Sequence, residues 1–180
     1  MKNRKAYPFR ILHLLGLALL LTFTGTGCGK RSATREWINQ PANGYISEVK
    51  TAEYMMSIQY QPPAYRADQE ILLNHSKTSR SQLTEEYDNM QQFFVKYKME
   101  AGGDLNSLSL TEKFRLVTSD TIPCADAHII PYSPGSPHHE ILLLFPTTEK
   151  EMGNDFSLNV AGFPQPDAVH NLVFHLKRQD

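Results

Sequence analysis

QFFVKYKME, residues 92–100, decides the fold class of this chain because two kinds of side chain alternate along it. The apolar and aromatic set is Phe93, Val95, Tyr97 and Met99, and the charged set is Lys96, Lys98 and Glu100. Successive side chains of an extended strand point to opposite faces of a sheet. The alternation therefore predicts a β-strand with one buried face and one solvated face.

The same period recurs upstream in YMMSIQYQ, residues 54–61, where every second side chain is apolar. Ala52-Glu53 separates this strand from residues 45–51, so the two segments are predicted to form a hairpin. Pro62-Pro63 ends the second strand, because proline donates no hydrogen bond to a sheet. Residues 65–75 and 81–90 are then predicted as helices, with Ser79 or Ser81 capping the second one.

The second half of the chain contains short strands spaced by turn residues. A hairpin is predicted from residues 114–117 and 121–130, and the continuous apolar run EILLLF, residues 140–145, is predicted as a central strand. The remaining segments are a possible helical turn within 105–113, a loop at 131–137, and strands at 156–160 and 170–177. About eight strands with two helices inserted early favour a mainly β, β-sandwich-like antiparallel domain. An α+β fold with a single sheet is the alternative.

Composition excludes several classes of protein. The 180 residues carry a formal net charge of −1, with 41% hydrophobic and 21% charged side chains, which argues against a disordered tail or a multi-span membrane protein. Four of the 18 basic residues and none of the 19 acidic ones lie in residues 1–27, so the remainder has 14 basic against 19 acidic residues, a net charge of −5. A mildly acidic body is not predicted to bind nucleic acid.

The N-terminus has the three parts of a secretory signal. A basic segment, residues 1–10, precedes the 13-residue apolar run Ile11–Phe23, which is shorter than the roughly 20 residues that a membrane-spanning helix needs. Gly25-Thr26-Gly27-Cys28 follows. This arrangement resembles a bacterial lipoprotein signal, in which the cysteine is acylated and becomes the new N-terminus.

The resemblance to a lipoprotein signal implies lipidation at Cys28 and a membrane partner through the attached acyl chains, which hold stably when there are two or more. Position 29, directly after the cysteine, is glycine and not the aspartate that retains lipoproteins in the inner membrane. An outer-membrane location is therefore expected, on either its periplasmic or its outer side. The predicted organisation is a signal peptide at 1–27, an acylated tether at 28–40 and one β-rich domain at 41–180.

The body is similar to a group of lipoproteins from gut-type, Bacteroidales-like Gram-negative bacteria that have no assigned activity. The stretches that carry this resemblance are NQPANG at 39–44, IQYQPPAY at 58–65, MQQFFVKY at 90–97 and SDTIPCADAH at 119–128. The resemblance implies a compartment and a shared fold, and it implies little about function.

No catalytic or metal site is predicted, and no cofactor is expected. Cys124, Asp126 and His128 would share a strand face, but the first and last of them would lie about 13 Å apart at ~3.3 Å per residue, too far for one metal ion. Cys124 is expected to be a buried apolar residue. The six histidines beyond the signal show no metal-binding spacing, and a site assembled from distant residues stays open.

Thr121 is a candidate for O-glycosylation. Asp120-Thr121-Ile122 matches the Asp-Ser/Thr-apolar acceptor of periplasmic O-glycosylation and lies in a predicted turn, where an acceptor would be exposed.

Three functions are compatible with these observations. The first is a non-enzymatic, lipid-anchored envelope protein that binds a partner protein or contributes to an assembly, for which a broad apolar patch is expected. The second is a module that binds a glycan or another small ligand on an aromatic surface, with Trp37, Tyr45 and Tyr132 as candidates. The third is an enzyme whose polar residues converge only in the folded chain.

Overall fold

The computed structural model describes residues 29–99, 110–131 and 138–178. Contacts divide the chain into two units, residues 1–35 and 36–180. Helix α2 (Gly29–Ile38) begins in the first unit and ends in the second. The second unit contains every strand in the described part of the chain.

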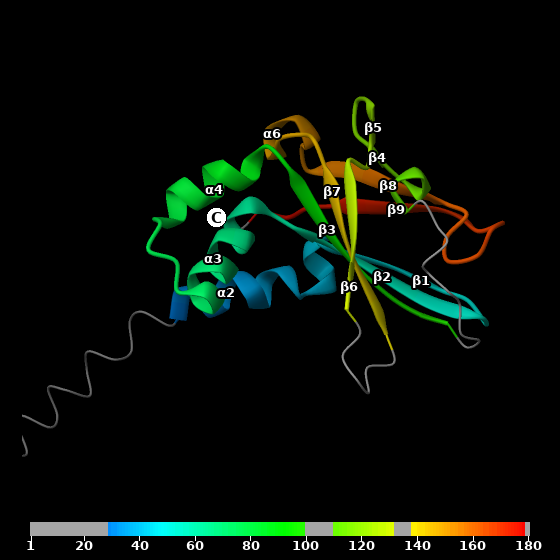
Figure 1. Cartoon of the computed structure of the whole chain (residues 1–180), viewed down its shortest axis with the longest axis horizontal. Coiled ribbons are helices and arrows are strands. Elements are labelled where there is room, and N and C mark those ends of the chain that lie inside the picture. The colour runs from blue at the N-terminus through cyan, green and yellow to red at the C-terminus, as the bar shows by residue number, and fades with distance from the viewer. Residues whose placement is uncertain (1–28, 100–109, 132–137, 179–180) are drawn as a thin grey trace, which may run out of the picture. The chain divides into compact units, whose positions relative to one another are not determined.

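Nine strands in the described ranges form two antiparallel sheets (Figure 1). The five-stranded sheet has the order β1 (Ile46–Lys50), β2 (Tyr54–Gln61), β3 (Gln91–Met99), β7 (His139–Phe145) and β6 (Asp126–Ile130). The four-stranded sheet has the order β5 (Thr121–Pro123), β4 (Phe114–Val117), β8 (Asp155–Ala161) and β9 (Val169–His175). The described helices of the second unit that follow α2 are η1 (Pro41–Asn43), α3 (Pro63–Asn74), α4 (Arg80–Asp88), α5 (Leu110–Lys113) and α6 (Glu149–Met152).

The predicted fold class, a mainly β sandwich-like domain, is confirmed, and the single-sheet alternative is wrong. The predicted hairpin at 114–130 is correct only in its first part, because residues 121–130 form two strands that belong to different sheets. Pro123 ends β5, and the N–H of Ala125 then donates to the carbonyl of Leu144 at 2.9 Å, in the other sheet. β6 consequently pairs with β7 rather than with β4.

The core lies between the two sheets and is dominated by aromatic rings. Phe93 of β3 lies 5.4 Å from Phe145 in its own sheet, and 5.9 and 5.7 Å from Phe156 and Phe174 in the opposite sheet, measured between ring centroids. All three contacts are edge-to-face, a favourable geometry for aromatic pairs. The alternation that predicted the strands therefore also identified the side chains that join the sheets.

Helices α3 and α4 connect β2 to β3, as the position of the two predicted helices indicated, and lie at one end of the sandwich (Figure 1). α3 begins two residues earlier than predicted because Pro63 occupies its first position, where the missing N–H has no helical partner to lose. Ser79 caps α4 in a capping box with Gln82. The two helices are joined by Asp68, which is buried and accepts hydrogen bonds from Arg80.

The segment predicted as a tether, residues 28–40, is helical over Gly29–Ile38. Ile38 is buried in the core of the second unit, and the indole N–H of Trp37 donates to the carbonyl of Lys177 at 3.2 Å. The possible helical turn within 105–113 corresponds to α5, and residues 132–137 of the predicted loop lie outside the described ranges.

None of the helices in the described ranges is long and apolar enough to cross a membrane.

Candidate functional site

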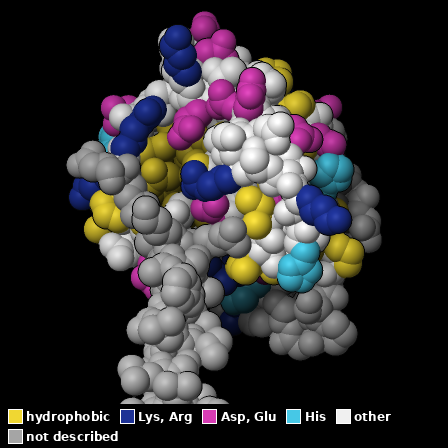
Figure 2. Space-filling view, turned by 90° about the vertical axis from the view of Figure 1, so that its left-hand side faces the viewer, with side chains coloured by type: hydrophobic (Ala, Val, Ile, Leu, Met, Phe, Trp, Pro, Cys, Tyr) yellow, Lys and Arg dark blue, Asp and Glu magenta, His cyan; other side chains and the backbone are white. Residues whose placement is uncertain are grey.

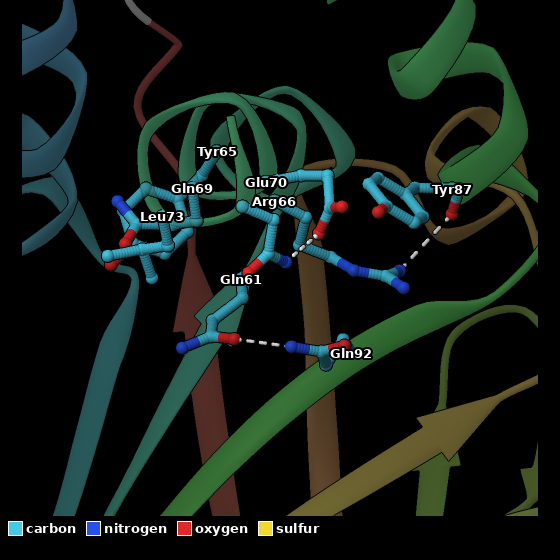
Figure 3. A pocket seen from close by; sticks show the side chains of 9 residues that line it. Gln61, Tyr65, Arg66, Gln69, Glu70, Leu73, Tyr87 and Gln92 are labelled. Atoms are coloured by element: carbon cyan, nitrogen blue, oxygen red, sulfur yellow. Dashed lines mark hydrogen bonds between the residues drawn. The ribbon is translucent and has the colours of Figure 1, made fainter. Parts of the chain in front are cut away.

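A polar pocket of about 310 Å³ lies beside α3, where β2 ends and β3 begins (Figure 3). Four of its lining side chains are amides, two are tyrosines, and one each is a guanidinium, a carboxylate and an apolar group. They are Gln61, Gln69, Asn74 and Gln92; Tyr65 and Tyr87; and Arg66, Glu70 and Leu73. The pocket thus combines helical and strand residues that are up to 31 positions apart.

The strand side of the pocket follows from the register of β2 and β3. Gln61 and Gln92 are directly opposite each other in the antiparallel pair. Their neighbours Tyr60 and Phe93 point into the core, so both amides point to the outer face of the sheet. The amide Nε2 of Gln92 donates to Oε1 of Gln61 at 2.5 Å.

The helical side of the pocket follows from the period of α3. Arg66, Gln69, Glu70 and Leu73 recur at spacings of three and four residues, which places them on one face of the helix. Asn74, one turn beyond Glu70, donates from Nδ2 to Oε2 of Glu70 at 2.7 Å. The carboxylate therefore has one polar partner on its own helix.

Arg66 is fixed in place by α4 and the residues that follow it. Its Nη1 donates to the carbonyl of Met90 at 2.6 Å and to that of Tyr87 at 3.3 Å. The guanidinium carbon lies 4.3 Å from the centroid of the Tyr87 ring, within range of a cation–π contact. Burial lowers the pKa of Arg66, but a guanidinium stays charged at any physiological pH.

Tyr87 closes the pocket from the α4 side (Figure 3). Its hydroxyl has a raised pKa, first because of burial and then because of the negative charge of Glu70. The phenol is therefore neutral at physiological pH and keeps its proton as a hydrogen-bond donor. Amides, a phenol and a fixed guanidinium together suit a ligand with many hydroxyl or carboxylate oxygens.

A second hollow, of about 670 Å³, lies between α4, α6 and Arg178. Its wall carries both charges, with Asp88 and Glu149 beside Lys150 and Arg178. The N–H of Glu149 donates to Oδ1 of Asp88 at 2.9 Å, and burial is the main cause of a raised pKa of the Glu149 carboxyl. Figure 2 shows acidic and basic side chains interleaved over this end of the molecule.

The predicted modification sites have different positions. Thr121 is exposed at the start of β5, an edge strand, directly after the turn at 118–120. The site is accessible, and its glycosylation stays a prediction. Cys28 lies outside the described residues, so its lipidation also stays a prediction.

Cys124, Asp126 and His128 do not converge on one site. Cys124 is buried, its Sγ donates to the carbonyl of Asp126 at 3.0 Å, and burial raises the pKa of its thiol. A thiol in that state is a poor nucleophile at neutral pH. Asp126 and His128 form an exposed pair at 2.9 Å. In the described residues no group of three or more His, Cys, Asp or Glu side chains could hold a metal ion.

The aromatic residues considered for ligand binding are not in the pocket. Tyr45 is buried and its hydroxyl donates to the carbonyl of Lys177 at 3.2 Å. Trp37 packs against the core, and Tyr132 lies outside the described ranges. The aromatic residues that line the pocket are instead Tyr65 and Tyr87. The available signal was the three-to-four spacing of polar residues on α3, which sequence reasoning assigned only to a helix.

Comparison with known proteins returned no matching family, no similar curated protein and no similar solved structure. The resemblance to the lipoprotein group therefore stays a prediction.

Proposed function

We propose that this protein is a non-enzymatic, lipid-anchored binding protein of the outer membrane, and that it holds a hydroxyl-rich ligand such as a glycan in the pocket beside α3. The observation that carries the proposal is the lining of four amides and two tyrosines around one cavity. Amides donate and accept at once, as hydroxyl groups do, and aromatic rings pack against the C–H faces of sugars.

The distribution of polar groups supports binding rather than catalysis. Among the described residues that line the pocket, Glu70 alone has a carboxylate, and it is hydrogen-bonded to Asn74. The hydrolysis of a glycoside usually requires two carboxyl groups that flank the bond to be cleaved. A single carboxylate with a neutral partner is better suited to accepting hydrogen bonds from a ligand.

The role in assembly, the first of the three functions considered, receives less support from the surface. The large exposed apolar side chains of the described residues are distributed over four elements rather than gathered on one. They are Met55 on β2, Leu72 and Leu73 on α3, Ile129 on β6, and Val169 and Val173 on β9. A stable protein interface usually buries a contiguous apolar centre.

Binding to an array of oligosaccharides tests the proposed ligand class. Full-length protein, solubilised from membranes in detergent, is expected to bind a subset of the array. The double variant Gln61→Ala/Gln92→Ala is expected to lose that binding because both amides line the pocket. It is expected to keep the fold because both side chains lie on the outer face of the sheet. Ser57→Ala, on the same face of β2 but outside this pocket, is the matched control. An array without any bound oligosaccharide contradicts the proposal.

Labelling with radioactive palmitate tests the anchor separately. Incorporation is expected in the wild-type chain and not in Cys28→Ser, which should also fail to fractionate with the outer membrane. Equal fractionation of both chains contradicts the anchoring.

A further inference from the structure

Two arginines near α3 use their guanidinium groups differently. Arg80 presents the edge formed by Nε and Nη2 to Asp68, with Nε 2.6 Å from Oδ1 and Nη2 3.2 Å from Oδ2. This is the two-point geometry in which a guanidinium binds a carboxylate. Arg66 uses the other nitrogen, Nη1, for the carbonyls of Tyr87 and Met90.

The corresponding edge of Arg66 has no partner within the described residues. Nε and Nη2 make no hydrogen bond to any residue in those ranges, and no carboxylate there lies within 4.0 Å of the side chain. No buried side-chain nitrogen or oxygen in the described part of the chain lacks a partner, so these two nitrogens are accessible to solvent. They belong to a residue that lines the pocket (Figure 3).

We propose that the pocket selects acidic oligosaccharides, and that the free Nε–Nη2 edge of Arg66 binds the carboxylate of a uronic acid residue. This inference rests on the proposed function, because it specifies the ligand of the same pocket. The ring of Tyr87 and the carbonyls of Tyr87 and Met90 hold the guanidinium in one orientation before the ligand arrives. A preorganised arginine loses little conformational entropy on binding, which favours tight and specific recognition of a planar carboxylate.

Glu70 limits the charge that the ligand carries. Arg66 and Glu70 are the two charged groups of the described lining, and their charges cancel. A ligand with one carboxylate per sugar pairs with Arg66 while its hydroxyl groups donate to Glu70. A doubly charged phosphate would gain the same pair, but Glu70 would repel it more strongly than it repels a singly charged carboxylate. The pocket therefore favours a singly charged acidic sugar over a phosphorylated one.

The experiment compares an acidic oligosaccharide from the array with its carboxyl-reduced counterpart, which differs only in that the carboxylate becomes a neutral hydroxymethyl group. Affinities are measured by calorimetry on the full-length lipoprotein in detergent. Wild-type protein is expected to bind the acidic form at least about tenfold more tightly, because a two-point charged contact is worth at least one factor of ten.

Three variants separate the pocket from the fold. Arg66→Lys keeps the positive charge and loses the two-point edge, so it should lower the preference for the acidic form about tenfold and leave the reduced form nearly unchanged. Glu70→Gln should increase the preference, because it removes a like charge. Arg80→Gln, which removes the other guanidinium, should leave the preference unchanged while it lowers the melting temperature.

The possible outcomes are distinct. Preference for the acidic form that is reduced in Arg66→Lys and increased in Glu70→Gln supports the inference. Binding only to neutral oligosaccharides, or a preference that none of the pocket variants changes, overturns the inference and leaves the proposed function in place. A preference for phosphorylated or sulfated sugars also overturns it. An array without hits overturns both.

Discussion

The interior between the sheets and the helical pair α3–α4 are held together in different ways. In the interior, aromatic side chains from both sheets pack with their edges against neighbouring faces, as Phe93 does with Phe145, Phe156 and Phe174. The two helices bury Ala67 and Leu83 and are also joined by polar contacts, such as the Arg80–Asp68 pair. Apolar packing leaves no group free for a ligand, whereas polar links leave unused donors such as those of Arg66.

Phe93→Ala is the strongest test of this difference. The side chain is fully buried and touches rings of both sheets, so its loss should reduce the free energy of unfolding by about 3–5 kcal/mol. Phe94→Ala, the next position on β3, changes a half-buried ring on the outer face and should have a much smaller effect. Chemical denaturation of both variants checks this, and equal losses would show that the core does not depend on the inner face of β3.

Gly44→Ala is expected to have the next largest effect, a loss of about 2–3 kcal/mol. Gly44 has a φ of 80°, and an added Cβ would lie 1.9 Å from the backbone oxygen of His175, at the end of β9. The backbone conformation alone, with φ 80° and ψ 8°, would cost alanine about 1–2 kcal/mol, and the contact with His175 adds to that cost. Gly153→Ala is a comparison at a positive-φ glycine without such a contact, since no atom lies within 4 Å of its added Cβ, although its ψ of −161° is disfavoured more strongly for alanine. Thermal unfolding measures both losses, and a loss at Gly44 of no more than about 1 kcal/mol would contradict a close contact there.

Ser79→Ala tests the polar region at a site without apolar packing. The hydroxyl accepts from the N–H of Gln82 at 3.3 Å and completes the capping box of α4, so its loss should reduce stability by about 1 kcal/mol. Ser81→Ala changes an exposed serine in the first turn of the same helix and should have little effect. If both variants unfold at the wild-type denaturant concentration, the cap does not stabilise α4.

Glu149→Gln should have the smallest effect, and it should increase the free energy of unfolding at pH 7, whereas the other variants reduce it. Burial is the main reason that the pKa of Glu149 is raised, so the folded state binds its proton more tightly than the unfolded state does. Stability from this group is therefore present at low pH and is lost as the pH rises through the raised pKa. The variant should be more stable than wild type at pH 7, by less than about 1 kcal/mol, and equal to it below about pH 4.

Unfolding curves at pH 7 and pH 4 measure this dependence. Glu85→Gln, which removes an exposed carboxylate from the wall of the same hollow, is the control for the loss of one negative charge. A variant that is less stable than wild type at pH 7 would show that the attraction of Arg178 outweighs burial.

The strands could be predicted from sequence more fully than the pocket could. Alternation along β2 and β3 is a property of neighbouring residues, and it correctly indicated that Phe93 points inward and Lys96 outward. The pocket depends on the pairing of Gln61 with Gln92 and on the approach of Tyr87 to Arg66. Those contacts join residues 31 and 21 positions apart, and no local pattern reports them.

By itself, the sequence determined which side chains face the interior and where the two helices interrupt the sheet, because both follow from periodicity and proline positions that act over a few residues. Only the tertiary structure decided that residues 126–130 leave one sheet for the other, and that the Cys124 thiol is buried while Asp126 and His128 form an exposed pair. It also decided that, within the described residues, Arg80 has a carboxylate partner and Arg66 does not. These outcomes depend on which distant backbone groups and charges meet, and that is settled only when the sheets pack.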